Sequence, residues 1–171
     1  MGKVIGSVSL FVGIIGFLYS WVMEQKRQQQ HMEEVLLFVQ RSIYAMEGEK
    51  IRIIDYLENY DSRDTLLKDT LREIARRLRL HSFPDGRMVW ETVFMEKQLS
   101  FGMDEESFAI VLAMGNGFFG RRREENASIL RRNLRQLEEQ GKRRKEQDAN
   151  ARKLWIPVGM LGGIMLMIIL I

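Results

Sequence analysis

Cysteine is absent from the 171-residue chain, which excludes a disulfide framework, a thiol nucleophile and a thiolate metal site. The two histidines, His31 and His81, are fifty residues apart and neither has a patterned Asp or Glu beside it, so we expect no metal site. The sequence contains no Walker A motif, and no serine has the context of a catalytic triad. We therefore expect neither an enzyme nor a bound cofactor.

A long uncharged run is present at each end of the chain, over residues 4–23 and 154–171. The second run would form a helix of about 27 Å, close to the thickness of one hydrocarbon core. Trp155 follows Arg152 and Lys153, and an aromatic residue beside cations is typical of a membrane boundary. We predict two transmembrane helices; the alternative for the second run is a buried core helix.

The N-terminal run has two further interpretations. A cleaved signal peptide has a shorter apolar region and a small-residue cleavage site, whereas this run ends in Tyr-Ser-Trp-Val-Met. Myristoylation needs Ser or Thr at position 6, where the chain has Gly6. We therefore predict that the run is retained as a span.

Small residues recur along one stripe of the first predicted span, at spacings of 4, 3, 4, 3 and 4 from Gly2 to Ser20. The second predicted span has two glycines four residues apart. Such residues let membrane helices approach closely, although glycine is also simply common in membrane helices. The candidate packing residues, on the other span or on partner spans, are Gly6, Ser9, Gly13, Gly16, Gly159 and Gly163.

Charged residues make up 29% of the chain and lie almost entirely between the two apolar runs. We predict a transmembrane helix over 1–23, a helical bundle over 24–140, a basic stalk over 141–153 and a second transmembrane helix over 154–171. Lysines and arginines flank the inner ends of both spans, so the positive-inside rule predicts a cytoplasmic middle domain. The predicted localisation is the cell membrane.

Helical periodicity runs through the middle domain. Met32, Leu36, Val39, Ile43 and Met46 form a stripe at spacings of 4, 3, 4 and 3, typical of an amphipathic helix. Further helices are expected over 51–60, 67–78 and 88–99, from 105 and from 121. Residues 61–64 should form an exposed turn with an N-cap, residues 83–86 a break, and Asp104 a second cap.

No segment shows sustained strand alternation. We therefore predict an all-α fold, a helical bundle domain bracketed by an N-terminal and a C-terminal transmembrane helix.

Residues 115–120 match the pattern G-x-G-x-x-G. A dinucleotide site needs a strand before this motif and a second strand after the helix. Here the helix after the motif leads into the basic stalk and then into the second predicted span, with no second strand. Phe118 and Phe119 would also crowd a phosphate. We interpret the motif as a flexible elbow between two helices.

Residues 121–153 contain twelve Lys or Arg and six Asp or Glu. A basic run that leads into a span indicates anionic lipid and not nucleic acid. Three arginines at the start of a helix are repelled by the positive end of the helix dipole. An external anion or acidic partner would offset this repulsion; the alternative is that the arginines form a solvated patch. The candidate partner or lipid contacts are Arg121, Arg122, Arg123, Lys142, Arg143, Arg144 and Lys145.

The C-terminal half resembles the stage III sporulation protein AB family of spore-forming bacteria. The resemblance depends on Leu112–Gly115, Asn133–Glu138, the charged stalk to Lys153 and the glycine-rich entry to the apolar tail, Val158–Ile171. Trp90, in Val-Trp-Glu, is similar to a tryptophan that family members place ahead of this region. We transfer no individual contact residue.

The resemblance implies a subunit of the channel between mother cell and forespore. The family's cytoplasmic domain is similar to that of the inner-membrane platform protein F of type II secretion systems. The implied role is non-catalytic: it couples a cytoplasmic secretion ATPase to other sporulation channel membrane proteins, and self-association stays open. One alternative is a generic membrane-anchored helical adaptor or anionic-lipid-binding protein. Another is a membrane-tethered nucleotide-binding enzyme that uses the glycine elbow.

Overall fold

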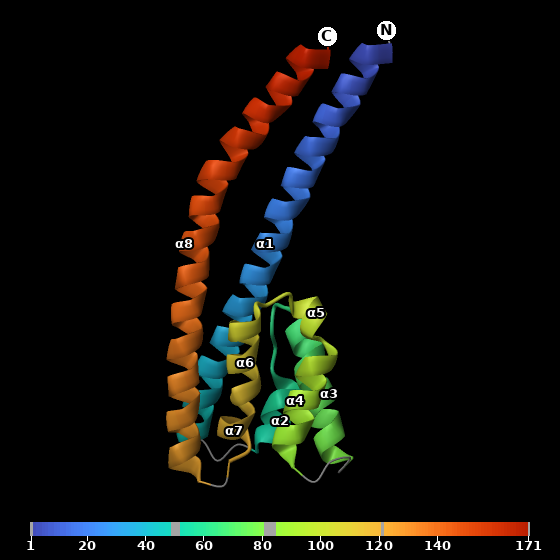
Figure 1. The fold of residues 1–171 in the computed structure, drawn as a ribbon. Helices are drawn as coiled ribbons and strands as arrows, with labels where there is room; N and C mark the ends of the chain where they lie inside the picture. The colour runs from blue at the N-terminus through green and yellow to red at the C-terminus, as the bar shows by residue number, and fades with distance from the viewer. Residues whose placement is uncertain (1, 49–51, 81–84, 121, 171) are drawn as a thin grey trace. The chain divides into compact units, whose positions relative to one another are not determined.

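A computed structural model of the chain describes residues 2–48, 52–80, 85–120 and 122–170. Over these residues the chain forms helices and no strand, as Figure 1 shows. The all-α class predicted from the sequence is therefore confirmed. Some residues are described by their backbone alone: 2–11, 14, 123, 124, 152, 155, 156, 160, 163, 164, 166, 167, 169 and 170.

The first and the last described residues belong to two long helices. Helix α1 spans Gly2–Gly48 and helix α8 spans Arg123–Leu170, which are 47 and 48 residues long. The shorter helices between them are α2 (Ile53–Asn59), α3 (Thr65–Arg79), α4 (Gly86–Glu96), α5 (Gln98–Phe101), α6 (Glu105–Ala113) and α7 (Gly115–Phe118).

The chain divides into two compact units. Unit 1 comprises Met1–Arg27 and Lys142–Ile171, and unit 2 comprises Gln28–Gly141. Helices α2 to α7 lie entirely in unit 2, whereas α1 and α8 each contribute residues to both units. Each of the two connections between the units is therefore part of one helix.

An aromatic cluster fills the centre of unit 2. The ring of Trp90 in α4 lies 4.5 Å from that of Phe94 and 4.9 Å from that of Phe118 in α7, measured between centroids. Phe38 of α1 stacks on the same indole at 6.3 Å, and the indole N–H donates to the carbonyl of Val111 in α6 at 2.9 Å. Trp90 thus joins four helices, and its burial and satisfied N–H both stabilise the unit.

Helix α1 packs into unit 2 with the face that the sequence predicts. Of its five-residue stripe, Met32, Val39 and Ile43 are buried, and the other two residues are half-buried against the core. Phe38 lies off that stripe and is nevertheless fully buried. The buried face is therefore wider than the predicted seam, as expected for a helix that covers a globular core.

Aspartates begin three of the short helices. Asp64 accepts a hydrogen bond from the backbone N–H of Leu66 at 2.9 Å, and Asp104 accepts one from that of Ser107 at 2.8 Å. Asp85 caps α4 in the same way. These bonds satisfy N–H groups that have no partner inside the helix, and they confirm the predicted caps of α3 and α6.

The turn before α3 is less exposed than the sequence suggests. Ser62 is 8% exposed, and its hydroxyl donates to the Glu34 carboxylate at 2.9 Å while it accepts from the backbone N–H of Asp64 at 3.1 Å. The expectation of a fully exposed turn was wrong at this residue because Ser62 fastens the turn to α1. Its neighbour Arg63 is exposed.

The single helix predicted over 88–99 is also wrong. The helix begins earlier, at Gly86, and ends at Glu96, after which the short helix α5 follows. The reorientation brings Phe101 into the core, where its ring lies 5.5 Å from that of Phe94. It leaves Leu99 97% exposed. Burial of an aromatic ring therefore outweighs the continuity of the helix.

We predict that Asp64→Ala lowers the free energy of unfolding by about 2–4 kcal/mol, because Asp64 has two partners to lose. Besides its cap bond, its Oδ2 lies 2.6 Å from Nδ1 of His31 in α1, and both side chains are nearly buried. Asp85→Ala is the matched control, since it removes an exposed cap and should cost about 1 kcal/mol. Urea unfolding followed by circular dichroism measures both, and equal losses would contradict the prediction.

Candidate functional site

The glycine-rich motif is part of the core of unit 2. Residues 115–118 form helix α7, in which Gly115, Gly117 and Phe118 are buried. A Cβ on Gly115 would lie 2.9 Å from Cδ1 of Trp90, and one on Gly117 would lie 2.5 Å from Cγ of Leu130. The prediction of a flexible elbow was therefore wrong: these glycines allow close packing of helices, and their faces are occupied by side chains of the same unit.

The predicted cationic residues fall into two groups. In unit 2, Arg122 is exposed just before α8, whereas Arg121 lies outside the described residues and Arg123 is described by its backbone alone. In unit 1, Lys142, Arg143 and Lys145 are exposed and Arg144 is half-buried. Their assignment as partner or lipid contacts stays a prediction.

Three of the glycines predicted to pack membrane helices can be placed. A Cβ on Gly13 or Gly16 would meet no atom within 4 Å, and one on Gly159 would lie 3.4 Å from Cδ1 of Leu18. Gly6, Ser9 and Gly163 lie outside the residues whose side chains are described. Leu18 and Gly159 thus mark a contact between α1 and α8 within unit 1, and the wider packing stripe stays a prediction.

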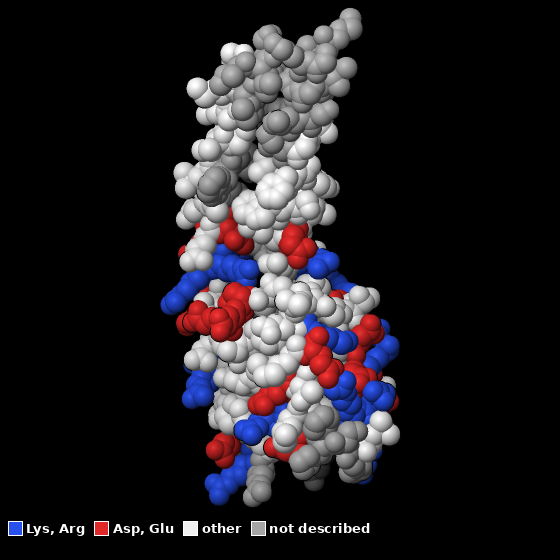
Figure 2. Space-filling model, turned by 45° about the vertical axis from the view of Figure 1, so that its right-hand side comes forward, with Lys and Arg blue, Asp and Glu red and all other residues white. Residues whose placement is uncertain are grey.

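Unit 1 exposes many large apolar side chains. Phe17, Tyr19, Leu154 and Ile168 are each more than two-thirds exposed. In Figure 2, blue and red side chains of both signs are interspersed over the charged part of the visible surface. In the portion of the chain that the structure describes, no helix is both long enough and apolar enough to cross a membrane.

The structure describes the surroundings of one of the two histidines, His31. His31 contacts Asp64 and lies edge-on to the ring of Phe101 at 5.9 Å between centroids. His81 lies outside the described residues. Among the described residues, no group of three or more His, Cys, Asp or Glu side chains comes together as a metal site. His31 therefore acts within the fold, where it joins α1 to the beginning of α3.

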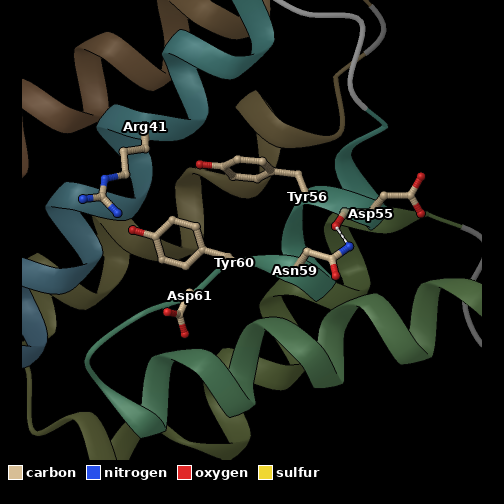
Figure 3. Close-up of a pocket in the computed structure, with 6 residues that line it drawn as sticks. All are labelled: Arg41, Asp55, Tyr56, Asn59, Tyr60 and Asp61. Atoms are coloured by element: carbon tan, nitrogen blue, oxygen red, sulfur yellow. Dashed lines mark hydrogen bonds between the residues drawn. The ribbon is translucent and has the colours of Figure 1, made fainter.

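A pocket of about 470 Å³ lies between α1 and α2 in unit 2. Its lining residues are Arg41, Asp55, Tyr56, Asn59, Tyr60 and Asp61. Figure 3 shows the hydroxyls of Tyr56 and Tyr60 pointing toward α1, with that of Tyr60 near the guanidinium of Arg41. The pocket therefore presents a cation and phenol groups from opposite walls.

Sequence reasoning missed this pocket. Tyr56 and Tyr60 are four residues apart, a spacing that places both on one face of a helical segment. This spacing is the one feature of the sequence that points to the pocket. The contribution of α1 could not be read from the sequence, because it depends on how α1 packs against α2.

The two acidic residues at the pocket rim form short ion pairs. Asp61 lies 2.6 Å from Nζ of Lys68, and Asp55 lies 2.9 Å from the guanidinium of Arg79. A hydrogen bond from Lys68 lowers the pKa of Asp61. Both acids are therefore paired with cations of the same unit.

Burial raises the pKa of both pocket tyrosines. For Tyr60 the positive charge of Arg41 acts in the opposite direction, and for Tyr56 the side chain of Ser42 and the charge of Arg41 do so. With a raised pKa, each phenol keeps its proton at neutral pH. The tyrosines can therefore donate hydrogen bonds to an acceptor in the pocket.

Comparison with protein families matches the chain to the family described as stage III sporulation protein AB. Its model matches residues 3–171. No curated protein and no solved structure matches the chain.

We predict that Gly117→Ala lowers the free energy of unfolding by about 1–3 kcal/mol, since the added methyl group would overlap the fully buried Leu130. Gly141→Ala is the matched control, because its Cβ would meet only Cγ of Met32 at 4.0 Å, inside helix α8. The control should gain about 0.5–1 kcal/mol from helix propensity. Urea unfolding tests both; a neutral Gly117→Ala would mean that α7 is loosely packed.

Proposed function

The chain belongs to the stage III sporulation protein AB family, and we propose that it acts as a non-catalytic membrane platform subunit of the sporulation apparatus. Membership makes it a sporulation-related protein. The observation that carries the proposal is the extent of the match, which includes the helical unit and both apolar ends. The proposed partners are a cytoplasmic secretion ATPase and other membrane proteins of the channel between mother cell and forespore.

In this proposal, residues 4–23 and 154–171 cross the membrane. Both runs lack charge, and their described large side chains, such as Phe17 and Leu161, are mostly exposed. Exposed apolar surface of this kind is costly in water and favourable in lipid. The proposal therefore gives these side chains a place to be buried.

The proposed orientation puts unit 2 in the cytoplasm. Lysines and arginines flank the inner end of each run, at Lys26 and Arg27 for the first and at Lys142–Lys145, Arg152 and Lys153 for the second, as the positive-inside rule requires. On that side of the membrane, unit 2 can meet an ATPase. Unit 2 would then be the part of the chain that contacts the ATPase and is moved by it.

Two continuous helices support a mechanical role. Both α1 and α8 extend from unit 2 into unit 1 without a described break. A helix resists bending and twisting because its backbone N–H groups bond to carbonyls one turn away; in α8 the exception is Pro157, which has no N–H and lies in unit 1, beyond the junction of the two units. A movement imposed on unit 2 by an ATPase would therefore be passed to the apolar ends.

A second candidate is an adaptor that binds anionic lipid through the basic stretch of α8. The observation in its favour is the exposure of Lys142, Arg143 and Lys145, since each cation near an anionic surface contributes about 1 kcal/mol. A nucleotide-binding enzyme has less support, because the glycines of the G-x-G-x-x-G motif pack against Trp90 and Leu130. We assign no catalytic step to the chain.

Topology is the first test, and the absence of native cysteine removes any labelling background. We predict that Arg63→Cys, in the exposed part of the turn before α3, is protected from a membrane-impermeant maleimide in intact vegetative cells and labelled after lysis. Gly2→Cys is the control and should be labelled in intact cells. Labelling of Arg63→Cys without lysis would place unit 2 outside and reject contact with a cytoplasmic ATPase.

A second experiment separates the platform from the lipid adaptor. Four cations are replaced together by glutamine: Lys142, Arg143, Arg144 and Lys145. For a platform, we predict that the full chain still co-purifies with the secretion ATPase of the same organism. For an adaptor, flotation with vesicles containing phosphatidylserine falls at least tenfold and no ATPase is recovered with either form.

A further inference from the structure

Leu99 is the most exposed large apolar side chain among the described residues of unit 2. It is 97% exposed, and Met95, four residues earlier, is 56% exposed. Between these two residues the chain passes from α4 into α5, which buries Phe101 instead. A single exposed leucine is common on a protein surface, so the meaning of Leu99 depends on where in the unit it lies.

Helix α5 lies at the end of unit 2 where α1 enters the unit. Gly102 ends α5 in the left-handed conformation, at φ 60°. It lies so close to α1 that a Cβ on it would be 2.9 Å from Nε2 of Gln28, which is the first residue of unit 2. In Figure 1, α5 accordingly lies at the upper end of helices α2 to α7. The packing against Gln28 therefore holds Leu99 at this end of the unit.

Helix α8 leaves unit 2 at the same end. The side-chain amide of Gln140 donates to the carboxylate of Glu106 at 2.7 Å, and Gln140 is the last residue but one of unit 2. Glu106 lies in the first turn of α6, which begins three residues after Gly102. Both helices that continue into unit 1 are therefore held next to the turn between α5 and α6.

The first uncharged run ends close to this point along α1. Its last residue, Met23, precedes Gln28 by five residues, and both belong to the same helix. Five residues of α-helix extend about 7.5 Å, and the polar headgroup layer adds about 5–8 Å on each side of the hydrocarbon core. A span that ends at Met23 would thus bring Gln28 to the outer part of the headgroup layer, together with the end of α5 that packs on it.

The charges near Leu99 favour an apolar contact with lipid and not an electrostatic one. The segment Lys97–Met103 has one lysine and no acid, and Glu96, just before it, accepts two hydrogen bonds from Arg77, at 2.9 and 2.8 Å. After the segment, Glu105 and Glu106 are exposed, and two acids do not favour an anionic surface. Insertion of an apolar side chain is therefore the contact that this end of unit 2 can make.

We propose that α5 contacts the membrane that residues 4–23 cross, with Leu99 inserted among the headgroups and the upper acyl chains of the cytoplasmic leaflet. The inference rests on the proposed membrane placement of the uncharged runs. It gives unit 2 a lipid contact of its own, in addition to the two spans. This contact needs no anionic lipid, in contrast to the basic stretch of α8, and it restricts how unit 2 can tilt on the membrane.

The test uses the full chain in nanodiscs of phosphatidylcholine. The chain has no native cysteine, so a single cysteine can carry the fluorophore nitrobenzoxadiazole. Leu99→Cys is compared with Met23→Cys, at the end of the run, and with Tyr44→Cys as the control in water. Tyr44 is 68% exposed and lies sixteen residues beyond Gln28, about 24 Å further along α1. Lipids that carry a nitroxide report contact with lipid, and iodide reports contact with water.

We expect the label at Leu99→Cys to be quenched by nitroxide lipid about threefold more than the label at Tyr44→Cys. Quenching by iodide should be about threefold weaker at Leu99→Cys than at Tyr44→Cys. The physical reason is that an apolar group at an interface lies about 5–10 Å deep, at the boundary of headgroups and acyl chains. Met23→Cys should be quenched by lipid at least as strongly as Leu99→Cys.

A second reporter keeps Leu99 in place, because the label itself is apolar. Ser100→Cys is exposed and is labelled in the otherwise native chain and in chains that also carry Leu99→Glu or Leu99→Phe. We expect Leu99→Glu to lower the lipid quenching at Ser100→Cys about threefold and Leu99→Phe to preserve it, since a carboxylate avoids the acyl boundary and an aromatic ring does not. Circular dichroism checks that the helices of each variant are intact.

Strong quenching of Leu99→Cys by iodide would leave this residue in water and overturn the proposal. Protection from both quenchers would overturn it too, because protein, such as a second copy of the chain, would then cover α5. Unchanged lipid quenching at Ser100→Cys in the Leu99→Glu chain would show that Leu99 does not make the contact.

Failure of this contact is distinguishable from failure of the proposed function. Lipid quenching at Met23→Cys without lipid quenching at Leu99→Cys would reject the contact alone. Absence of lipid quenching at Met23→Cys would reject the proposed span and with it the membrane platform. Lipid quenching at both positions without co-purification of the ATPase would keep the contact and reject the platform role.

Discussion

The indole ring of Trp90 lies against Gly115, and this contact sets how closely α7 can approach α4. A Cβ at Gly115 would lie only 2.9 Å from the ring, so the missing side chain brings Phe118 within 4.9 Å of the indole. The same ring contacts Phe38, whose neighbours include Tyr60 at 5.0 Å. The position of the pocket tyrosine therefore depends, through Phe38, on the packing at the centre of unit 2.

Local signals predicted much of the helical architecture. Asp64 and Asp104 were readable as caps because their chemistry acts within three residues of their own position. The α1 stripe was readable because burial on one side of a helix leaves a periodic pattern. The break at Lys97 was not readable, since it depends on the burial of Phe101 beside Phe94, which is a contact between elements.

The candidate site was less predictable for the same physical reason. Arg41 and Tyr60 are nineteen residues apart in the sequence, and their proximity requires α1 to pack against the segment that holds Tyr56 and Tyr60, as the ring contacts of Phe38 show. The glycine motif shows the opposite case. A pattern readable as a phosphate site is occupied by Trp90 and Leu130, because close helix packing and close phosphate approach both require a residue without a Cβ.

Helices α1 and α8 each belong to both units, and this has a consequence for how the sequence can change over time. One inserted residue near Arg27 or Lys142 would rotate everything beyond it by about 100° and move it by about 1.5 Å. Only insertions of about seven or eleven residues restore the facing side. Length changes should therefore accumulate in the segments between α1 and α8, while the two helical junctions keep a constant phase.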